Sequence, residues 1–237
     1  MSIHTRTIEY KDGDVVLEAY VAWEEGHDPK PGVLISHAWG GRSEFEQGKA
    51  EILAELGYVG FALDLYGKGV LGTSREENSA LMQPLLDDRA VLQRRMQLAL
   101  AQLKKQKEVD GSRVAAMGFC FGGLCVLDLA RTGADVCGVA SVHGLFKPPG
   151  NTQGEQIKAK VLVLHGWDDP MATPDQVLSL AEELTTAGAD WQIHGYGNTV
   201  HAFSNPAADD PAHGTVYDQD ADRRSWQSLQ LFFAEIF

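Results

Sequence analysis

The chain carries a cysteine between two glycines at the end of an apolar run. Residues 114–123 read VAAMGFCFGG, so Cys120 is the centre of a Gly-x-Cys-x-Gly pattern. This spacing is that of a nucleophile elbow with sulfur in place of the usual serine oxygen. Glycines at positions 118 and 122 would let a strand turn sharply into a helix, whose first N–H groups and dipole favour a thiolate. Taken alone, the pattern is equally compatible with a buried structural cysteine.

An acid and a histidine follow two later apolar runs. The segment LHGWDDP holds Asp169, four residues after His165, with Asp168 as a rival acid. An acid in this place can orient a histidine, although Asp-Asp-Pro is also ordinary turn chemistry. The segment GNTVHAF places His201 in a glycine- and asparagine-containing loop, where a single histidine means little by itself.

The order of these groups along the chain favours catalysis. Cys120, Asp169 and His201 occur in the order nucleophile, acid, base, each just beyond a predicted strand, which is the order of an α/β-hydrolase triad. We therefore predict a thiolate nucleophile, an imidazole base and an orienting carboxylate. The segment ISHAWGG follows an early strand, where an oxyanion loop is expected, so the predicted oxyanion donors are the backbone N–H groups of Phe121 and Ala38.

Predicted strands and helices alternate over most of the chain. The pattern predicts a hairpin over residues 4–23, strands over 32–37, 58–67, 113–119, 136–144, 159–166 and 191–197, and helices over 43–56, 79–107 (one or two), 121–133, 173–188 and 222–237. The later strands are continuously apolar, as expected where helices cover both faces of a sheet. We predict an α/β fold of the α/β-hydrolase type with a mostly parallel central sheet, helices on both faces and no separate lid domain. The whole of residues 1–237 is expected to form one domain, with the hairpin joined to the sheet.

Composition limits the classes of partner. The 237 residues carry a net charge of −13, which disfavours binding to a phosphate backbone. The opening MSIHTRTIEY has no apolar segment of a secretory signal, and no run approaches the length of a membrane span. Three cysteines are few and odd in number, which favours reduced thiols in the cytoplasm. We expect a cytoplasmic monomer or homodimer that binds neither nucleic acid nor membrane.

The motifs GFCFGG, HGWDDP, GNTVHAF and DLYG together resemble the dienelactone hydrolase family of α/β-hydrolases, over roughly residues 30–237. A cysteine in the elbow is uncommon among α/β-hydrolases and typical of this family. The resemblance implies that Cys120, Asp169 and His201 match the family's triad. It also implies a small, lidless, cytoplasmic enzyme with no metal or organic cofactor.

The sequence departs from the family pattern at two positions. The family's type member is similar in having a glutamate near the nucleophile, where this chain has His37, which could contact the thiolate or brace its loop; bracing is favoured. The type member also has an arginine four residues after the catalytic histidine, where this chain has Asn205. Arg42 is a possible replacement, although a solvated arginine at a helix start is the favoured interpretation. A carboxylated dienelactone is therefore not a secure substrate.

A cysteine nucleophile restricts the class of substrate that we predict. A thiolate is a good leaving group, so a tetrahedral intermediate collapses backward unless the other leaving group is also good. This favours aryl and enol esters and activated lactones over alkyl esters and amides. We expect Trp39 and Trp167 to line an apolar pocket, with His37 and Tyr66 as further pocket residues.

Four alternatives remain open at this stage. The same triad could attack an activated phosphate triester. Cys120 could be a redox sensor, although Cys125 lies about 140° away around a helix and could not easily bridge to it. The fold could be a non-catalytic binding module, although no triad member is missing. Finally, His165, Asp168 and Asp169 resemble metal ligands without a further ligand at a typical spacing.

Overall fold

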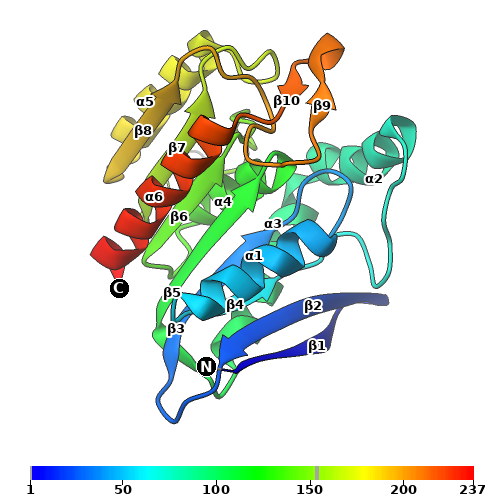
Figure 1. The fold of residues 1–237 in the computed structure, drawn as a ribbon, viewed down its shortest axis with the longest axis vertical. Coiled ribbons are helices and arrows are strands. Elements are labelled where there is room, and N and C mark those ends of the chain that lie inside the picture. Colours follow the sequence, from blue (N-terminus) through cyan, green and yellow to red (C-terminus); the bar gives the residue numbers. More distant parts are fainter. Residues whose placement is uncertain (1, 153–154) are drawn as a thin grey trace. The chain divides into compact units, whose positions relative to one another are not determined.

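The computed structural model describes residues 2–152 and 155–237 (Figure 1). The chain forms two compact units, Met1–Met117 and Gly118–Phe237, and strand β5 (Val109–Phe119) runs across the boundary between them. That residues 1–237 form one domain remains our prediction from the sequence.

The first unit begins with a long hairpin. Strands β1 (Ile3–Asp12) and β2 (Val15–Glu24) pair antiparallel, and Gly13 supplies the positive φ of +59° in the turn between them. Strand β2 also pairs antiparallel with β4 (Val59–Ala62), which pairs parallel with β3 (Lys30–Ser36). The hairpin is therefore hydrogen-bonded to the parallel strands of this unit through β2.

Two predicted elements of the first unit differ from the structure. The strand predicted over 58–67 ends at Ala62, because the side chain of Asp64 accepts the backbone N–H groups of Tyr66 and Gly67 and closes a turn. The region predicted as helix over 79–107 is two helices, α2 (Arg75–Asp87) and α3 (Arg89–Lys104). Helix α2 starts earlier than predicted because Ser74 caps it, accepting the N–H of Glu77.

Helix α1 (Glu44–Glu55) begins where the sequence predicts it. Ser43 caps the helix, and the side chain of Glu46 accepts the N–H of Ser43 in return, so the pair forms a capping box. The capping box therefore fixes the C-terminal end of the early loop, residues 37–42.

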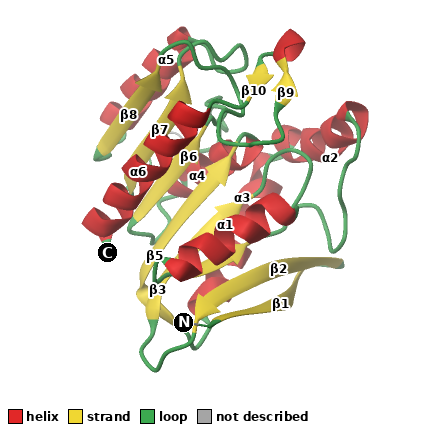
Figure 2. Ribbon diagram, viewed as in Figure 1, coloured by secondary structure: helices red, strands yellow, loops and turns green. Residues whose placement is uncertain are grey.

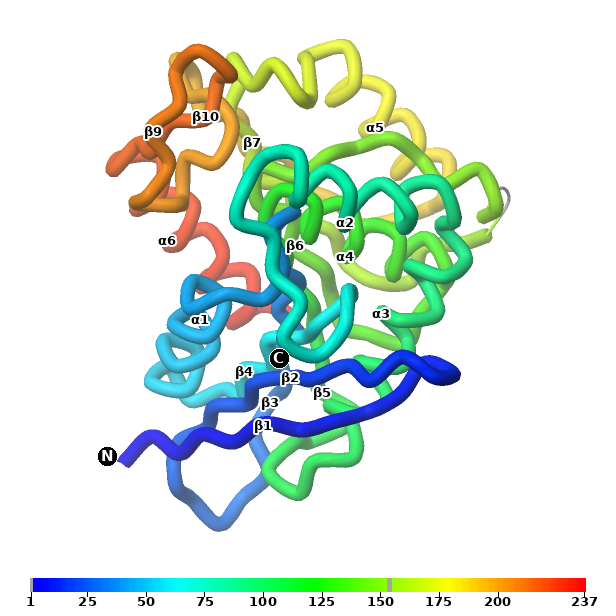
Figure 3. Tube along the Cα trace, turned by 90° about the vertical axis from the view of Figure 1, so that its right-hand side faces the viewer, coloured from blue at the N-terminus to red at the C-terminus, as the bar shows by residue number. Residues whose placement is uncertain are grey.

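The second unit contains three parallel strands with helices on both sides. Strands β6 (Gly138–Val142), β7 (Lys160–Gly166) and β8 (Trp191–Tyr196) pair in that order. Helix α6 (Gln219–Ile236) lies on one side of these strands, and α4 (Phe121–Arg131) and α5 (Pro174–Thr186) lie on the other (Figures 2 and 3). The carboxyl ends of parallel strands, where the reactive groups were predicted, meet at one edge of the sheet.

A short element of the second unit was not predicted. Strands β9 (Asp209–Asp210) and β10 (Thr215–Val216) form a small antiparallel pair around a single 3-10 turn, Pro211–His213. Two-residue strands leave no periodicity that a sequence pattern could reveal. Among the helices of residues 2–152 and 155–237, none combines the length and apolarity that a membrane span requires.

Candidate active site

Cys120 stands at a strained turn between β5 and α4. Its φ is +54° and its ψ is −117°, a conformation that a side chain with a Cβ rarely adopts. The turn is so tight that a Cβ on Gly118 would lie 2.1 Å from the carbonyl oxygen of Gly122. Cys120 is partly exposed, whereas Phe119 and Phe121 on either side are buried. This is the backbone geometry of a nucleophile elbow.

Asp169 and His201 form a buried pair. The Oδ2 atom of Asp169 lies 2.7 Å from Nδ1 of His201, and each residue is 1% exposed. The other carboxylate oxygen of Asp169 accepts the backbone N–H of Met171 at 2.7 Å, which holds the carboxylate in place. The rival acid Asp168 is exposed, and Asp169 is the acid that contacts the imidazole.

The loop that carries His201 is held by the unpredicted β10 segment. The N–H of His201 donates to the carbonyl of Gly214 at 2.9 Å, and the N–H of Val216 donates to the carbonyl of His201 at 3.1 Å. These bonds fix the backbone of His201 on both sides, so the imidazole is held by more than its contact with Asp169.

The electrostatic surroundings favour a charged imidazole. Burial lowers the pKa of His201, but the negative charge of the Cys120 thiolate and the hydrogen bond with Asp169 outweigh burial and raise the pKa to about 10. The nitrogen opposite Asp169, Nε2, is buried and has no hydrogen-bond partner of good geometry among the described residues. An imidazole with one nitrogen fixed by an acid and the other near a thiol can hold the proton of that thiol.

A further histidine, His143, belongs to this cluster and was missed by sequence reasoning. It follows β6 directly, its side chain is buried, and its ring makes an edge contact with the ring of His201 at 5.3 Å between centroids. Its Nδ1 lies 3.2 Å from the backbone nitrogen of Cys120. The one available signal was a histidine just beyond a strand end. The strand was predicted over residues 136–144, whereas β6 ends at Val142, so His143 was taken as part of the strand.

The predicted residues of the early loop lie in the first unit. The imidazole of His37 is fully buried, accepts the N–H of Leu65 at Nε2 and donates from Nδ1 to the carbonyl of Ala38. Burial lowers the pKa of His37 despite the negative charges of Glu46 and Asp64, so the ring is neutral. These contacts support the bracing role. The N–H of Ala38 donates to the carboxylate of Glu46 at 3.2 Å, and its role in an oxyanion hole stays a prediction.

Two predicted pocket residues contact each other in the first unit. The hydroxyl of Tyr66 donates to the carbonyl of Trp39 at 2.9 Å, and the ring of Tyr66 meets His37 edge-on at 4.7 Å. The guanidinium of Arg75 lies 5.5 Å above the ring of Trp39. In the second unit, Trp167 is 43% exposed after β7, two residues before Asp169. The assignment of all four residues to a substrate pocket stays a prediction.

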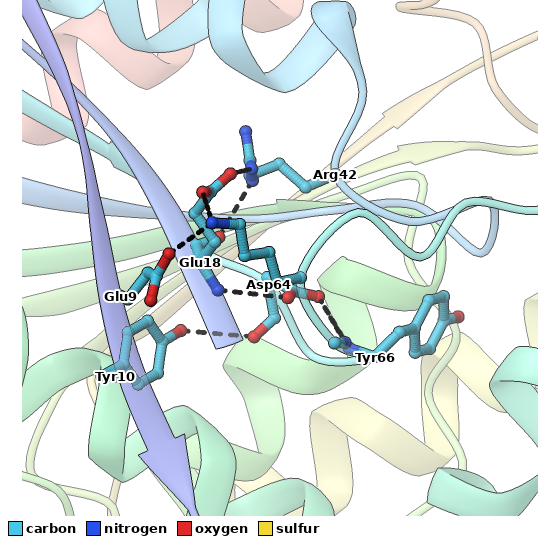
Figure 4. A network of polar contacts seen from close by, with 8 residues as sticks. Glu9, Tyr10, Glu18, Arg42, Asp64 and Tyr66 are labelled. Carbon is cyan, nitrogen blue, oxygen red and sulfur yellow. Dashed lines mark hydrogen bonds and ion pairs between the residues drawn. The ribbon is translucent and has the colours of Figure 1, made fainter. Parts of the chain in front are cut away.

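Arg42 is not the solvated arginine that was expected. Its side chain is only 10% exposed and pairs with the carboxylate of Glu18 at 2.7 Å, while its Nε donates to the carbonyl of the same residue (Figure 4). The N–H of Glu18 in turn donates to Asp64. The expectation of a solvated arginine is wrong, because the carboxylate of Glu18 on strand β2 pairs with the guanidinium in a largely buried position. Asn205, at the position of the family's substrate-binding arginine, stabilises a local turn, because its side-chain oxygen accepts the N–H of Ala207.

No group of three or more histidine, cysteine, aspartate or glutamate side chains that could hold a metal ion occurs within residues 2–152 and 155–237. The three cysteines all lie within the described residues, and none of them is in a disulfide.

The chain is similar to known proteins over almost its whole length. The model of the dienelactone hydrolase family matches residues 17–237. A crystal structure of P91, described as a dienelactone hydrolase-like promiscuous phosphotriesterase from metagenomic libraries, is 37% identical, covers 100% of both chains and superposes with a TM-score of 0.92. The structure named m3DLH is 34% identical over 99% of both chains, also with a TM-score of 0.92. A protein of Aquifex aeolicus strain VF5, described as a candidate carboxymethylenebutenolidase, is 27% identical over 95% of this chain and 96% of its own.

The fold is thus that of the α/β-hydrolases, with a mostly parallel sheet and flanking helices, as predicted. Within that class the chain belongs to the dienelactone hydrolase family and is a hydrolase. Both the predicted fold and the predicted family are confirmed.

Proposed function

We propose that the protein hydrolyses activated carboxylic esters and lactones through a Cys120–His201–Asp169 triad and a thioester intermediate. The observation that carries this proposal is the buried 2.7 Å contact between Asp169 and His201, beside a cysteine held at φ +54°. The family match and the relative described as a candidate carboxymethylenebutenolidase support ester and lactone substrates.

The first half-reaction acylates the cysteine. The Sγ thiolate of Cys120 bonds to the carbonyl carbon, and the carbonyl oxygen takes the negative charge. Phe121 begins α4 directly after Cys120, and the N-terminus of a helix favours negative charge, so its N–H is suited to hold this oxyanion. The bond to the leaving oxygen then breaks, and the imidazolium of His201 supplies a proton where the leaving group needs one.

The second half-reaction benefits from the loss of charge on sulfur. The thiolate is a principal cause of the raised pKa of His201, so acylation of Cys120 removes that cause and makes the imidazole a better base. His201 then takes a proton from water, the hydroxide adds to the thioester, and the carbon–sulfur bond breaks to restore the thiolate.

A second candidate activity is attack on activated phosphate triesters. It is favoured by the 37% identical neighbour that is described as a promiscuous phosphotriesterase. The same thiolate would displace an aryl oxide from phosphorus, which leaves a phosphoryl group on sulfur for water to remove.

A panel of aryl esters, enol lactones and aryl phosphate triesters tests both candidates with wild type, Cys120→Ala and His201→Ala. The proposal expects turnover of esters and lactones by wild type and its loss in both variants. Turnover of any ester at the wild-type rate by Cys120→Ala would refute the triad. A burst of aryl oxide from a triester that needs Cys120 would support the second activity, and its absence would refute that activity.

The remaining expectations concern the cell and the assembly. Three cysteines without a disulfide support a reducing compartment such as the cytoplasm. We propose a small-molecule hydrolase that works without a metal or organic cofactor, as a monomer or homodimer.

A further inference from the structure

His143 hydrogen-bonds to two segments that are distant in sequence. Its Nδ1 lies 3.2 Å from the backbone nitrogen of Cys120, which also donates to the carbonyl of Val142 at 3.1 Å. Its Nε2 lies 2.8 Å from the hydroxyl oxygen of Ser204, which is itself buried. One imidazole therefore connects the elbow with the segment that follows His201.

The chemistry of the partners fixes the form of this ring. A backbone amide nitrogen can only donate, so Nδ1 of His143 accepts the N–H of Cys120. The ring proton is then on Nε2, which donates to the hydroxyl oxygen of Ser204. Both bonds together require the neutral ring, because a proton on Nδ1 would break the bond to Cys120.

The surroundings of His143 hold it rigidly. Its φ is +38°, a conformation that is costly for a residue other than glycine and persists only where neighbours enforce it. Its own N–H donates to the carbonyl of Leu164 at 2.8 Å, and its ring meets Phe203 edge-on at 5.1 Å between centroids. A backbone strained in this way at a strand end, beside Cys120, is a feature of functional sites rather than of ordinary turns.

The far end of the link is tied to the catalytic loop. Ser204 is three residues beyond His201 and lies in a turn that is closed by a bond from the N–H of Asn205 to the carbonyl of Ala202. Ala202 also has a positive φ of +59°. A shift of the Ser204 hydroxyl would therefore be transmitted to the backbone of His201.

We propose that His143 is a positioning residue that ties the backbone of Cys120 to the loop of His201 and so keeps the thiolate aligned with the imidazole. The proposal rests on the triad of the proposed function. His143 acts through these two residues, since both of its ring nitrogens are already engaged. A misplacement of about 1 Å between reacting groups can cost on the order of 100-fold in rate, so this link bears directly on catalysis.

Three variants separate positioning from packing. His143→Phe keeps a ring of similar shape and removes both hydrogen bonds. His143→Asn places an amide oxygen near the position of Nδ1, and asparagine tolerates a positive φ better than most residues. Ser204→Ala removes the acceptor of Nε2 while His143 stays in place.

The first readout is kcat and KM for a reactive aryl ester, with the unfolding temperature of each variant measured in parallel. We expect His143→Phe to lower kcat by about 10- to 100-fold with little change in KM, and His143→Asn to recover a large part of that loss. Ser204→Ala should lower kcat severalfold. If neither variant at position 143 folds, the kcat of Ser204→Ala decides whether His143 is a positioning residue. Wild-type kcat in folded His143→Phe overturns the proposal, as does wild-type kcat in Ser204→Ala if neither variant at position 143 folds. An equal loss in both variants at position 143 without any loss in Ser204→Ala overturns it as well.

The second readout does not depend on ester turnover. Alkylation of Cys120 by iodoacetamide at neutral pH, followed by mass spectrometry of its peptide, should be about tenfold slower in His143→Phe than in wild type, because a displaced imidazolium stabilises the thiolate less. If wild type turns over no ester, the proposed function fails, and this readout alone decides the role of His143. An unchanged alkylation rate in His143→Phe would then overturn it.

Discussion

Replacement of Gly118 by alanine tests whether the tight elbow is required for activity. The new Cβ would lie 2.1 Å from the carbonyl oxygen of Gly122 and 2.3 Å from its carbonyl carbon. These atoms belong to the backbone of the first turn of α4, so no side chain can rotate away to make room. Real Cβ contacts essentially never fall under 3.0 Å, and the oxygen must therefore retreat by about 0.9 Å.

This displacement sets the expected magnitude. A shift of about 1 Å in a reacting group costs on the order of 100-fold in rate, or about 2.7 kcal/mol of transition-state stabilisation. Overpacking of this kind also destabilises the fold by about 1–3 kcal/mol. We expect the Gly118→Ala variant to be folded, with a lower unfolding temperature and a kcat/KM for an aryl ester about 100-fold below that of wild type.

A matched control is available in the same protein. A Cβ on Gly197 would meet no atom within 4 Å, and the φ of Gly197 is not positive, so Gly197→Ala adds the same methyl group without a clash. We expect this control to retain wild-type kcat/KM and unfolding temperature. If folded Gly118→Ala is within threefold of wild type in kcat/KM, the argument that this turn places the nucleophile is refuted.

Three further predictions follow from the site and its surroundings. Asp169→Asn should lower kcat by about 10³- to 10⁴-fold at an unchanged unfolding temperature, since the amide no longer fixes the tautomer of His201; a loss below tenfold would contradict the acid's role. The pKa of His201 is raised to about 10, so its proton is held throughout the neutral range and lost above it. Stopped-flow acylation by an alkyl ester, whose leaving group needs that proton, should be constant near pH 7 and fall as pH rises through about 10; a fall centred near pH 7 would count against the pair. Finally, Arg131 is 2% exposed and bonds to buried Asp128 at 3.1 Å and to Glu183 at 2.7 Å. Arg131→Met should therefore reduce the free energy of unfolding in urea by about 3–5 kcal/mol, and a change below 1 kcal/mol would show that Asp128 is compensated otherwise.

The positions of Cys120 and Asp169 were predictable because each of these residues follows a strongly apolar strand. The runs before Cys120 and Asp169 are buried on both faces, so their ends were easy to locate in the sequence. The choice of Asp169 over Asp168 could not be made from spacing alone, because two adjacent acids after a strand are equivalent until the loop is folded. The structure separates them by burial, since Asp168 is exposed and Asp169 is not.

Features that depend on contacts between distant segments were beyond the reach of the sequence. His143 is linked to Cys120 and Ser204 by hydrogen bonds that only the folded chain creates. The β10 segment that fixes His201 is two residues long and has no periodicity. Arg42 was expected in solvent because its partner, Glu18, lies 24 positions earlier on the hairpin.

The central claim is that Cys120 becomes acylated during turnover. Rapid acid quench of a reaction with an activated aryl ester, followed by peptide mass spectrometry, measures this directly. The account predicts the mass of the acyl group on the peptide that contains Cys120, its removal by hydroxylamine and a decay at the rate of turnover. Turnover without any adduct on Cys120, or with the acyl group on another residue, would contradict the account.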